Sequence, residues 1–307
     1  MKQIKHIILF VFLIGSSEAF AQFEPQFTQY MFNETFINPA YAGSRDHAAF
    51  TAAYRNQWVG MDGAPKTQTF SGHMPFRNQK SAFGLAIMND EISVIHDFYV
   101  FGTYAYRIHL PKGNLAMGLQ GGLVNHQEQL GDVKTQDIGD VTFLGTPRIT
   151  VPNTGFGIYY NQPNAYIGLS IPRMITNKVD PSTSKSLNTV NIDNWHYFMM
   201  GGYVHPINDG IKIKATFMLK GVKGAPVSSD IGAHILFNES IWIGANYRAK
   251  DSWAALLSMQ INKQLRMGYS FDYTISQLKR VNSGTHEITI GYDFSFDKNN
   301  VVTPRYF

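Results

Sequence analysis

Histidine and carboxylate side chains are the residues in this sequence that could bind a metal ion. The ten histidines are dispersed, and His96, His205 and His234 all lack the H-x-x-x-H spacing of a zinc-binding helix. Three aspartates within Asp132–Asp140 could bind calcium together with backbone carbonyls. Because they lack EF-hand spacing, a solvated acidic loop is the simpler interpretation. We therefore expect neither a metal site nor a cofactor.

Covalent catalysis has equally weak support. No Gly-x-Ser-x-Gly elbow occurs in the chain, although a Ser/His/Asp set could still assemble from separate strands, as in barrel lipases. The glycine pairs near Gly118–Gly122 and Gly201–Gly202 do not predict phosphate binding, since no helix is expected after either. Glycines inside strands more often mark bends or close approaches of the backbone. The expectation is a protein that is not an enzyme.

Basic residues are gathered in one place. Lys212, Lys214, Lys220 and Lys223 lie along one expected strand and its loop. They could form a hydrated lumen wall, or a docking face for an acidic partner segment. The net charge of +4 is otherwise spread along the chain, so no nucleic-acid surface is expected. The chain has no cysteine, which excludes disulfides and thiolate metal sites.

The composition indicates which elements position these residues. Hydrophobic residues make up 44%, aromatic residues 14% and charged residues only 16%, against about 25% charged in typical globular domains. The hydrophobic content is too low for a bundle of membrane helices. It suits a barrel that presents apolar and aromatic side chains to lipid and polar ones to its lumen.

The stretch His286–Phe296 shows this pattern most clearly. Its odd positions, including Thr289 and Gly291, are small or polar, whereas its even positions, including Phe294 and Phe296, are apolar. A period of two predicts a strand with one wet and one oily face. The spacing of Thr289, Gly291, Phe294 and Phe296 also resembles the closing-strand signal of bacterial outer-membrane barrels.

Similar stretches, bounded by Gly, Pro, Asn or Asp, predict about fourteen strands, an even number as in bacterial barrels. The expected strands are His47–Arg55, Lys66–Phe76, Ser81–Met88, Phe98–Leu110, Leu115–Gln127, Thr154–Tyr160, Ala165–Ile171, Trp195–Val204, Ile211–Lys220, Asp230–Phe237, Ile241–Arg248, Trp253–Ile261, Leu265–Tyr273 and Thr285–Phe296.

The connections between these strands alternate in length. Every second one is short, such as Asn238–Ser240, whereas most of the others are longer, including Asn89–Asp97, Glu128–Asn153 and Pro172–Asn194. Short periplasmic turns opposite long extracellular loops are typical of outer-membrane barrels. The sequence therefore predicts an all-β, closed, antiparallel transmembrane barrel, with both termini in the periplasm. Closure pairs every backbone group in lipid.

The N-terminus predicts export. Lys2 and Lys5 precede the short apolar run Ile7–Ile14, and Ala19–Ala21 offers a cleavage site near Ala21/Gln22. The expected division is a signal peptide over 1–21, an N-terminal periplasmic segment over 22–46, a barrel over 47–296 and a tail over 297–307. The segment 22–46 has no strong period. It could pack under the barrel rim or into the lumen, or its aromatic residues could dock a partner.

Several stretches point to one family: Gln29–Met31, Asn38–Gly43, Arg55–Trp58, Gly155–Tyr160, Tyr166–Ser170, Gly284–Ile288 and Pro304–Phe307. They resemble the PorP/SprF family of Bacteroidetes, outer-membrane proteins of the type IX secretion and gliding apparatus. The resemblance covers essentially the whole mature chain. One departure is Thr303, where the family suggests serine. The residues expected to serve structure or partner contact are Asn38, Pro39, Ala40, Tyr41, Gly43, Trp58, His286, Pro304, Arg305, Tyr306 and Phe307.

The resemblance implies an accessory outer-membrane component that aids export or surface retention of a partner by binding. The implied partners are an adhesin-like secreted protein with a type IX C-terminal sorting domain and other secretion subunits. Contact is expected through Glu128–Asn153 and Pro172–Asn194. Two alternatives stay open: an outer-membrane channel for small or hydrophobic solutes, and a barrel enzyme.

Overall fold

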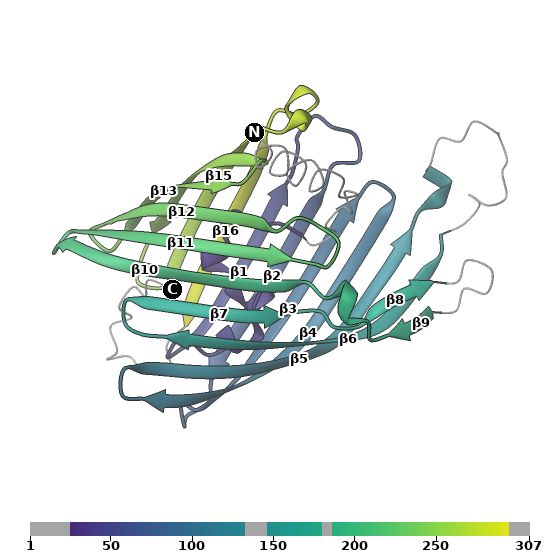
Figure 1. Cartoon of the computed structure of the whole chain (residues 1–307). Coiled ribbons are helices and arrows are strands. Elements are labelled where there is room, and N and C mark those ends of the chain that lie inside the picture. Colours follow the sequence, from purple (N-terminus) through teal and green to yellow (C-terminus); the bar gives the residue numbers. More distant parts are fainter. Residues whose placement is uncertain (1–24, 133–145, 180–185, 295–307) are drawn as a thin grey trace, which may run out of the picture.

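The computed structural model describes residues 25–132, 146–179 and 186–294, which form a closed antiparallel barrel of fourteen strands (Figure 1). The expected all-β fold class and strand number are confirmed. Its strands are β1 (Ala48–Asn56), β2 (Lys66–Pro75), β3 (Ser81–Ile92), β4 (Ile95–Leu110), β5 (Gly113–Glu128), β6 (Arg148–Asn161), β7 (Ala165–Ile171), β10 (Tyr197–Asn208), β11 (Ile211–Gly221), β12 (Ser228–Phe237), β13 (Ile241–Arg248), β14 (Ser252–Gln260), β15 (Leu265–Thr274) and β16 (Thr285–Phe294).

The sheet closes where the first strand meets the last. Ala48 lies opposite Phe294, and Asn56 lies opposite His286. Every other neighbour in the ring follows the chain order, apart from β7 and β10, which flank an inserted hairpin. A ring without free edges pairs its backbone groups within the sheet, as a lipid environment requires.

Side chains alternate between the two faces of the wall as the period of two predicts. In β16, Ile288 and Ile290 are 46% and 42% exposed on the outside, whereas Thr289 between them is 3% exposed and faces the lumen. In β15, Tyr269 is exposed and Ser270 is fully buried. The outer face is therefore apolar and aromatic, and the inner face is largely polar.

The two ends of the barrel differ in their connections. One end, here called the turn end, carries the short connections 111–112, 162–164 and 209–210; the opposite, loop end carries 129–147 and 172–196. The expectation of a long connection over Asn89–Asp97 is wrong. Strands β3 and β4 continue through it and leave only Ser93 and Val94 between them, with Ser93 at a φ of 55°.

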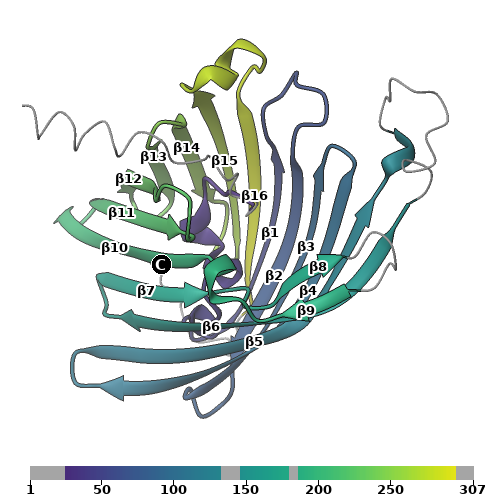
Figure 2. The ribbon, with the colours of Figure 1, turned by 45° about the vertical axis from the view of Figure 1, so that its right-hand side comes forward.

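A hairpin of β8 (Thr176–Val179) and β9 (Ser186–Thr189) lies in the connection between β7 and β10 and forms a sheet of its own (Figure 2). The short 3-10 turns are η1 (Tyr30–Phe32), η2 (Glu34–Phe36), η3 (Pro39–Tyr41), η4 (Leu130–Asp132), η6 (Ile192–Asn194) and η7 (Gln277–Arg280). No helix within the described ranges is long and apolar enough to cross a membrane.

Candidate functional site

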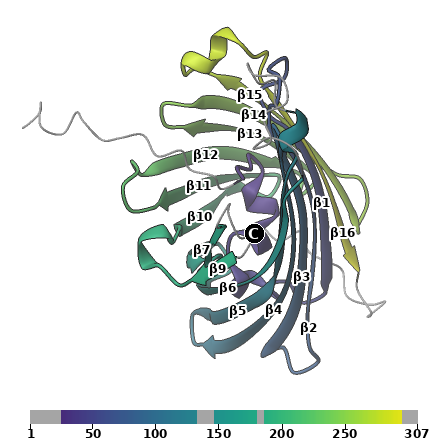
Figure 3. The same ribbon diagram turned by 90° about the vertical axis from the view of Figure 1, so that its right-hand side faces the viewer.

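Residues 25–46, here called the lumen segment, lie inside the barrel (Figure 3, purple). Thr28 contacts the loop ends of β15 and β16, whereas Arg45 contacts Asp293 near the turn end. The expected periplasmic segment over 22–46 therefore lies in the lumen at its described residues, 25–46, and the position of the N-terminus itself stays a prediction. The alternative of packing into the lumen is confirmed.

The lumen segment contains three 3-10 turns, and its own asparagine and proline shape the third of them, η3. Asn38 Oδ1 accepts a hydrogen bond from the backbone N–H of Ala40 at 2.9 Å and caps η3, which begins with Pro39. Asn38 Nδ2 donates to the carbonyl oxygen of Ile158 at 3.0 Å. The wall encloses the segment on all sides, so no single apolar face is needed, which explains its lack of a strong period.

Glycines in the wall allow η3 to approach closely. A Cβ atom at Gly118 would lie 2.3 Å from the backbone nitrogen of Ala40, and one at Gly157 would lie 2.0 Å from Asn38 Oδ1. Both glycines are therefore contact points for the lumen segment. The sequence-based interpretation of Gly118–Gly122 as close approaches rather than a phosphate site fits Gly118.

Substituting Gly118→Ala should lower the free energy of unfolding by about 1–3 kcal/mol, because the added methyl group meets backbone atoms that cannot rotate away. The measurement is the thermal unfolding midpoint in detergent micelles. Gly121→Ala, on the same strand with nothing within 4 Å of its Cβ position, is the matched control. Equal midpoints for the two variants would show that the lumen segment does not pack against β5.

A buried set of charges, here called the latch, fixes the lumen segment near the loop end. Thr28 Oγ1 donates to Asp272 Oδ2 at 2.6 Å, and the backbone N–H groups of Thr28 and Gln29 donate to Glu287 at 2.8 and 2.9 Å. Arg55 bridges the two carboxylates, at 2.8 Å to Asp272 and 2.9 Å to Glu287. Charge-assisted bonds of this kind are short and strong.

A second arginine continues the network. Arg248 Nε donates to Asp230 at 2.9 Å, and its Nη2 donates to the backbone carbonyl of Phe27 at 3.3 Å. Asn246 donates to the carbonyl of Thr28 at 2.9 Å. The wall therefore pairs the backbone of the lumen segment, which an enclosed, irregular chain requires.

The turn end holds the other end of the segment. Arg45 Nη1 donates to both carboxylate oxygens of Asp293 at 2.8 Å. The backbone N–H of Gly43 donates to His73 Nδ1 at 3.0 Å, and Arg107 donates to the carbonyl of Ala42 at 3.3 Å. The lumen segment is thus fixed at both ends by charged residues of the wall.

Glu34 stands between these two attachments and is fully buried. Its carboxyl group faces the hydroxyls of Tyr159 and Tyr166 and the ammonium of Lys214. Glu34 lies outside the membrane-spanning strands. Burial raises the pKa of its carboxyl group to about 7, while the Lys214 ammonium lowers this pKa. The Lys214 ammonium also lies over the ring of Trp242 at 5.8 Å.

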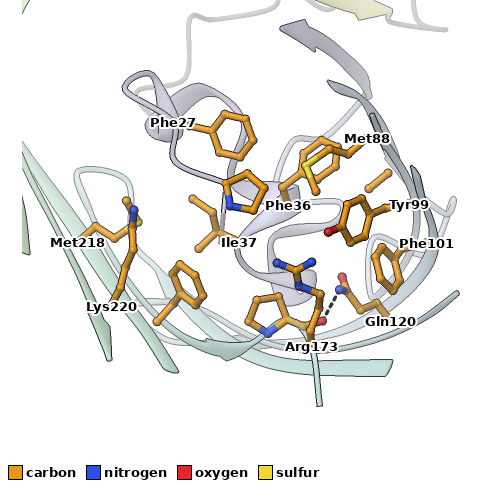
Figure 4. Close-up of a pocket in the computed structure, with 14 residues that line it drawn as sticks. Phe27, Phe36, Ile37, Met88, Tyr99, Phe101, Gln120, Arg173, Met218 and Lys220 are labelled. Atoms are coloured by element: carbon orange, nitrogen blue, oxygen red, sulfur yellow. Dashed lines mark hydrogen bonds between the residues drawn. The ribbon is translucent and has the colours of Figure 1, made fainter. Parts of the chain in front are cut away.

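A small cavity remains between the lumen segment and the wall near the loop end (Figure 4). Most of its lining is apolar; the labelled apolar residues are Phe27, Phe36, Ile37, Met88, Tyr99, Phe101 and Met218. Its volume is about 40 Å³. An engineered cavity of about 150 Å³ holds benzene, so this one holds no aromatic ring unless side chains move.

The structure brings part of the expected family signature together. Asn38, Pro39, Ala40, Tyr41 and Gly43 all lie in the lumen segment, and the Tyr41 ring packs edge-on against His73 with centroids 5.2 Å apart. Their structural role is internal packing. A role in partner contact stays a prediction.

The other signature residues lie elsewhere. The backbone N–H of Trp58, in the first loop, donates to Thr285 Oγ1 at 3.1 Å. His286 Nδ1 lies 2.7 Å from the Tyr269 hydroxyl on the outer face. Of the other predicted residues, Thr289, Gly291 and Phe294 lie in β16. The rest lie outside the described residues: Phe296, Pro304, Arg305, Tyr306 and Phe307.

The basic stripe is divided among acidic partners within the protein. Lys212 pairs with Glu239, Lys220 Nζ lies 3.8 Å from Asp230, and Lys223 Nζ lies 2.8 Å from Asp193. Lys214 is buried beside Glu34, as described above. The four lysines therefore do not form one continuous face for an acidic partner.

Sequence reasoning missed the latch. Arg55 of β1, Asp272 of β15 and Glu287 of β16 are charged residues at inward-facing positions of three neighbouring strands in the ring. The alternation of inward and outward residues along the strands places a charge at an inward position on each of three neighbouring strands. This coincidence is the signal from which the latch could have been predicted. Within the described ranges no group of three or more His, Asp or Glu side chains could hold a metal; Asp132 lies there, whereas Asp137 and Asp140 lie outside.

Comparison with known proteins gives one family and a set of similar folds. A family model described as "Type IX secretion system membrane protein PorP/SprF" matches residues 19–292. No curated protein sequence matches the chain.

The solved structures that resemble it include the CymD monoaromatic hydrocarbon channel, with a TM-score of 0.53 and 9% identity, covering 87% of this chain and 94% of that one. A TodX monoaromatic hydrocarbon channel mutant gives a TM-score of 0.50 and 10% identity, covering 86% and 94%. A Pseudomonas aeruginosa FadL homologue gives 0.49 and 12%, covering 92% and 97%. At these identities CymD and TodX show a shared barrel fold and nothing more.

Proposed function

The chain belongs to the PorP/SprF family of type IX secretion system membrane proteins and is an outer-membrane barrel, and from this premise we propose that it is an accessory component of that system. It aids export, or surface retention, of a partner protein by binding, without covalent chemistry. The proposed partners are a secreted, adhesin-like protein with a type IX C-terminal sorting domain and other subunits of the secretion and gliding apparatus.

The observation that carries this proposal is the filled lumen. The chain's own residues 25–46 occupy it and are bonded to the wall at both ends, by the latch and by the Arg45–Asp293 pair. A barrel closed in this way offers no open route for a solute. Its useful surfaces are then those outside the lumen, which favours partner binding over transport.

The loop end supplies an apolar surface for such a partner. Val190 and Ile192 are 69% and 61% exposed. They lie on a connection, whereas the other exposed apolar residues of the barrel mostly lie on the lipid-facing wall. Val227 on the neighbouring connection is 66% exposed, and the Lys223–Asp193 ion pair joins the two connections. Exposed apolar side chains in water mark interaction sites when they cluster.

The double variant Val190→Asp, Ile192→Asp should lower the recovery of the secreted partner at least roughly tenfold, since burying one such side chain contributes about 1.5–3 kcal/mol. The measurement is an affinity pull-down of the tagged, full chain from detergent-solubilised outer membrane, with mass spectrometry of the proteins that co-purify. Val281→Asp, at an exposed position on another connection, is the matched control.

Either of two results would contradict the proposal. One is recovery of the barrel alone even after mild cross-linking. The other is equal loss of the partner from the double variant and from the Val281→Asp control, because a general charge effect would then explain both.

A channel for hydrophobic solutes is the second candidate, and the apolar lining of the cavity in Figure 4 favours it. The small volume and the bonded lumen segment count against it. It predicts solute uptake without any partner. An enzyme has no support from the family's description, and we propose none.

The boundaries of the chain remain predictions. We propose a signal peptide over 1–21, cleaved near Ala21/Gln22, a barrel over 47–296 and a tail over 297–307. Sequencing the N-terminus of the protein purified from outer membrane tests the cleavage site. The short connections of the turn end then face the periplasm.

A further inference from the structure

We propose that a second cavity, at the turn end of the barrel, binds carboxylate side chains of an acidic protein segment that enters from the periplasm. This inference rests on the proposed function only for the orientation of the barrel. The cavity has a volume of about 310 Å³, far larger than the one in Figure 4. It lies between Arg45 of the lumen segment, Trp242 of β13, Arg266 of β15, Asp293 of β16 and Lys263 in the connection 261–264.

The acidic residues of its lining are already neutralised. Asp293 accepts two hydrogen bonds from Arg45 and lies 3.4 Å from His47. Glu239 pairs with Lys212. Asp293 also attracts Arg266 electrostatically, but Arg45 already binds both of its carboxylate oxygens.

The two remaining cations of the lining, Arg266 and Lys263, form no hydrogen bond or ion pair with a carboxylate in the described part of the chain. Arg266 makes no hydrogen bond or ion pair there. Its guanidinium packs against the ring of Phe32, with 4.3 Å between the guanidinium carbon and the ring centroid. Lys263 is exposed and likewise forms no ion pair within those ranges. Counting Lys212, which pairs with Glu239, the cavity has four cations against two carboxylates, an excess of two positive charges among these residues.

The position of the Arg266 guanidinium suits a carboxylate. Stacking on Phe32 occupies one face of the planar group, and its N–H donors lie in the plane, where a carboxylate accepts two of them in parallel. Because Phe32 restricts the side chain, less conformational entropy is lost on binding. Lys263 adds a mobile point charge at the edge of the same cavity.

The lining favours a protein segment over other anions. Trp242 and Ile261 offer apolar contact for the stems of side chains. Gln260 Nε2 and Asn262 Oδ1 are bonded within the turn, which leaves Gln260 Oε1 and Asn262 Nδ2 to pair with a backbone. The cavity lies inside the barrel wall, where the bilayer lipids that contact the outer face do not reach. An acidic peptide matches all three properties: charge, mixed lining and entry from the open end.

The test uses the full-length protein in detergent and the peptide acetyl-hexaglutamate-amide as the probe, titrated by calorimetry. We expect saturable binding that weakens with added salt. Arg266→Gln and Lys263→Gln should each weaken it at least roughly tenfold, since a hydrogen bond to a charged group contributes about 1.5–3 kcal/mol. Lys112→Gln, on another turn of the same end, should bind like the unmodified protein.

Binding of the peptide should quench or enhance the fluorescence of Trp242. Loss of this change in a Trp242→Phe variant would locate the probe beside Trp242. Undiminished binding by Lys263→Gln would overturn the proposal, and this exposed position keeps the test valid if Arg266→Gln fails to fold. Binding of inorganic phosphate without the peptide would also overturn it. So would peptide binding that appears only after residues 295–307 are removed, because the chain's own tail would then be the occupant.

The outcome is separable from the proposed function. Arg266→Gln and Lys263→Gln leave the loop end unchanged, so recovery of the secreted partner should persist in both. Loss of the partner from Val190→Asp, Ile192→Asp with intact peptide binding would show that the two surfaces act independently.

Discussion

Planar bilayers that contain a variant lacking residues 25–43 are expected to show steady ionic conductance, whereas the full chain should keep the pore closed. The described lumen segment fills the barrel and is bonded to its wall at both ends. Eight-stranded barrels are filled by side chains, and barrels of 16–18 strands leave an aqueous channel. A barrel of fourteen strands without its segment should conduct at least roughly ten times more than the full chain.

The wall of this variant should still fold. Arg55 lies between Asp272 and Glu287 whether or not the segment is present, so the deletion leaves no latch carboxylate without its cation. Residues 44–46 keep the connection to β1. Migration on a gel with and without heating, which distinguishes folded from unfolded barrels, checks this directly. A folded deletion variant with the low conductance of the full chain would show that the lumen segment does not close the pore.

Replacing Arg55 should produce the largest loss of stability. Arg55→Met leaves Glu287 buried without a cation and leaves Arg248, 3.9 Å away, as the one cation beside Asp272 among the described residues. Breaking a buried ion pair in this way costs about 3–5 kcal/mol. The expected result is a clear drop in the thermal unfolding midpoint in detergent micelles, together with pore opening in the bilayer assay.

A triple variant separates charge from packing. Combining Arg55→Met with Asp272→Asn and Glu287→Gln removes all three charges, so none of them is left buried without its partner. Much of the lost stability should return. Arg77→Ala, at an exposed turn, controls for simple loss of an arginine. Equal stability of Arg55→Met and the unmodified protein, or no recovery in the triple variant, would contradict the latch.

The barrel wall could be predicted from the sequence because each strand carries its own signal. The expected strand Ile211–Lys220 differs by one residue from β11, since lipid outside and polar groups inside impose a period of two on neighbouring residues. The two largest errors were the start of β6, which lies at Arg148 rather than Thr154, and the loop expected over Asn89–Asp97. Polar residues there suggested a loop, but these residues extend the hydrogen-bonded ladder between β3 and β4 beyond the apolar band.

The interior could not be predicted in the same way, because its contacts join residues far apart in the chain. Lys214 alternates with apolar neighbours as a hydrated wall residue would, yet it is buried beside Glu34. Thr28 and Asp272 are separated by 244 positions. Nothing in a local pattern indicates such a pair, although an inward charge such as Asp272 does indicate that a partner exists.

The latch also fixes the order in which this protein can be assembled. Arg55 and Asn246 also contact Thr28, but the bonds of Thr28 and Gln29 to Asp272 and Glu287 cannot form until β15 and β16 have joined the sheet. Contacts between such distant parts of a chain form late, because a long loop must close before they are made. Completion of the wall and sealing of its interior are therefore one event. A chain whose synthesis stops before the final hairpin gains neither, and an unsealed lumen distinguishes the unfinished molecule from the finished one.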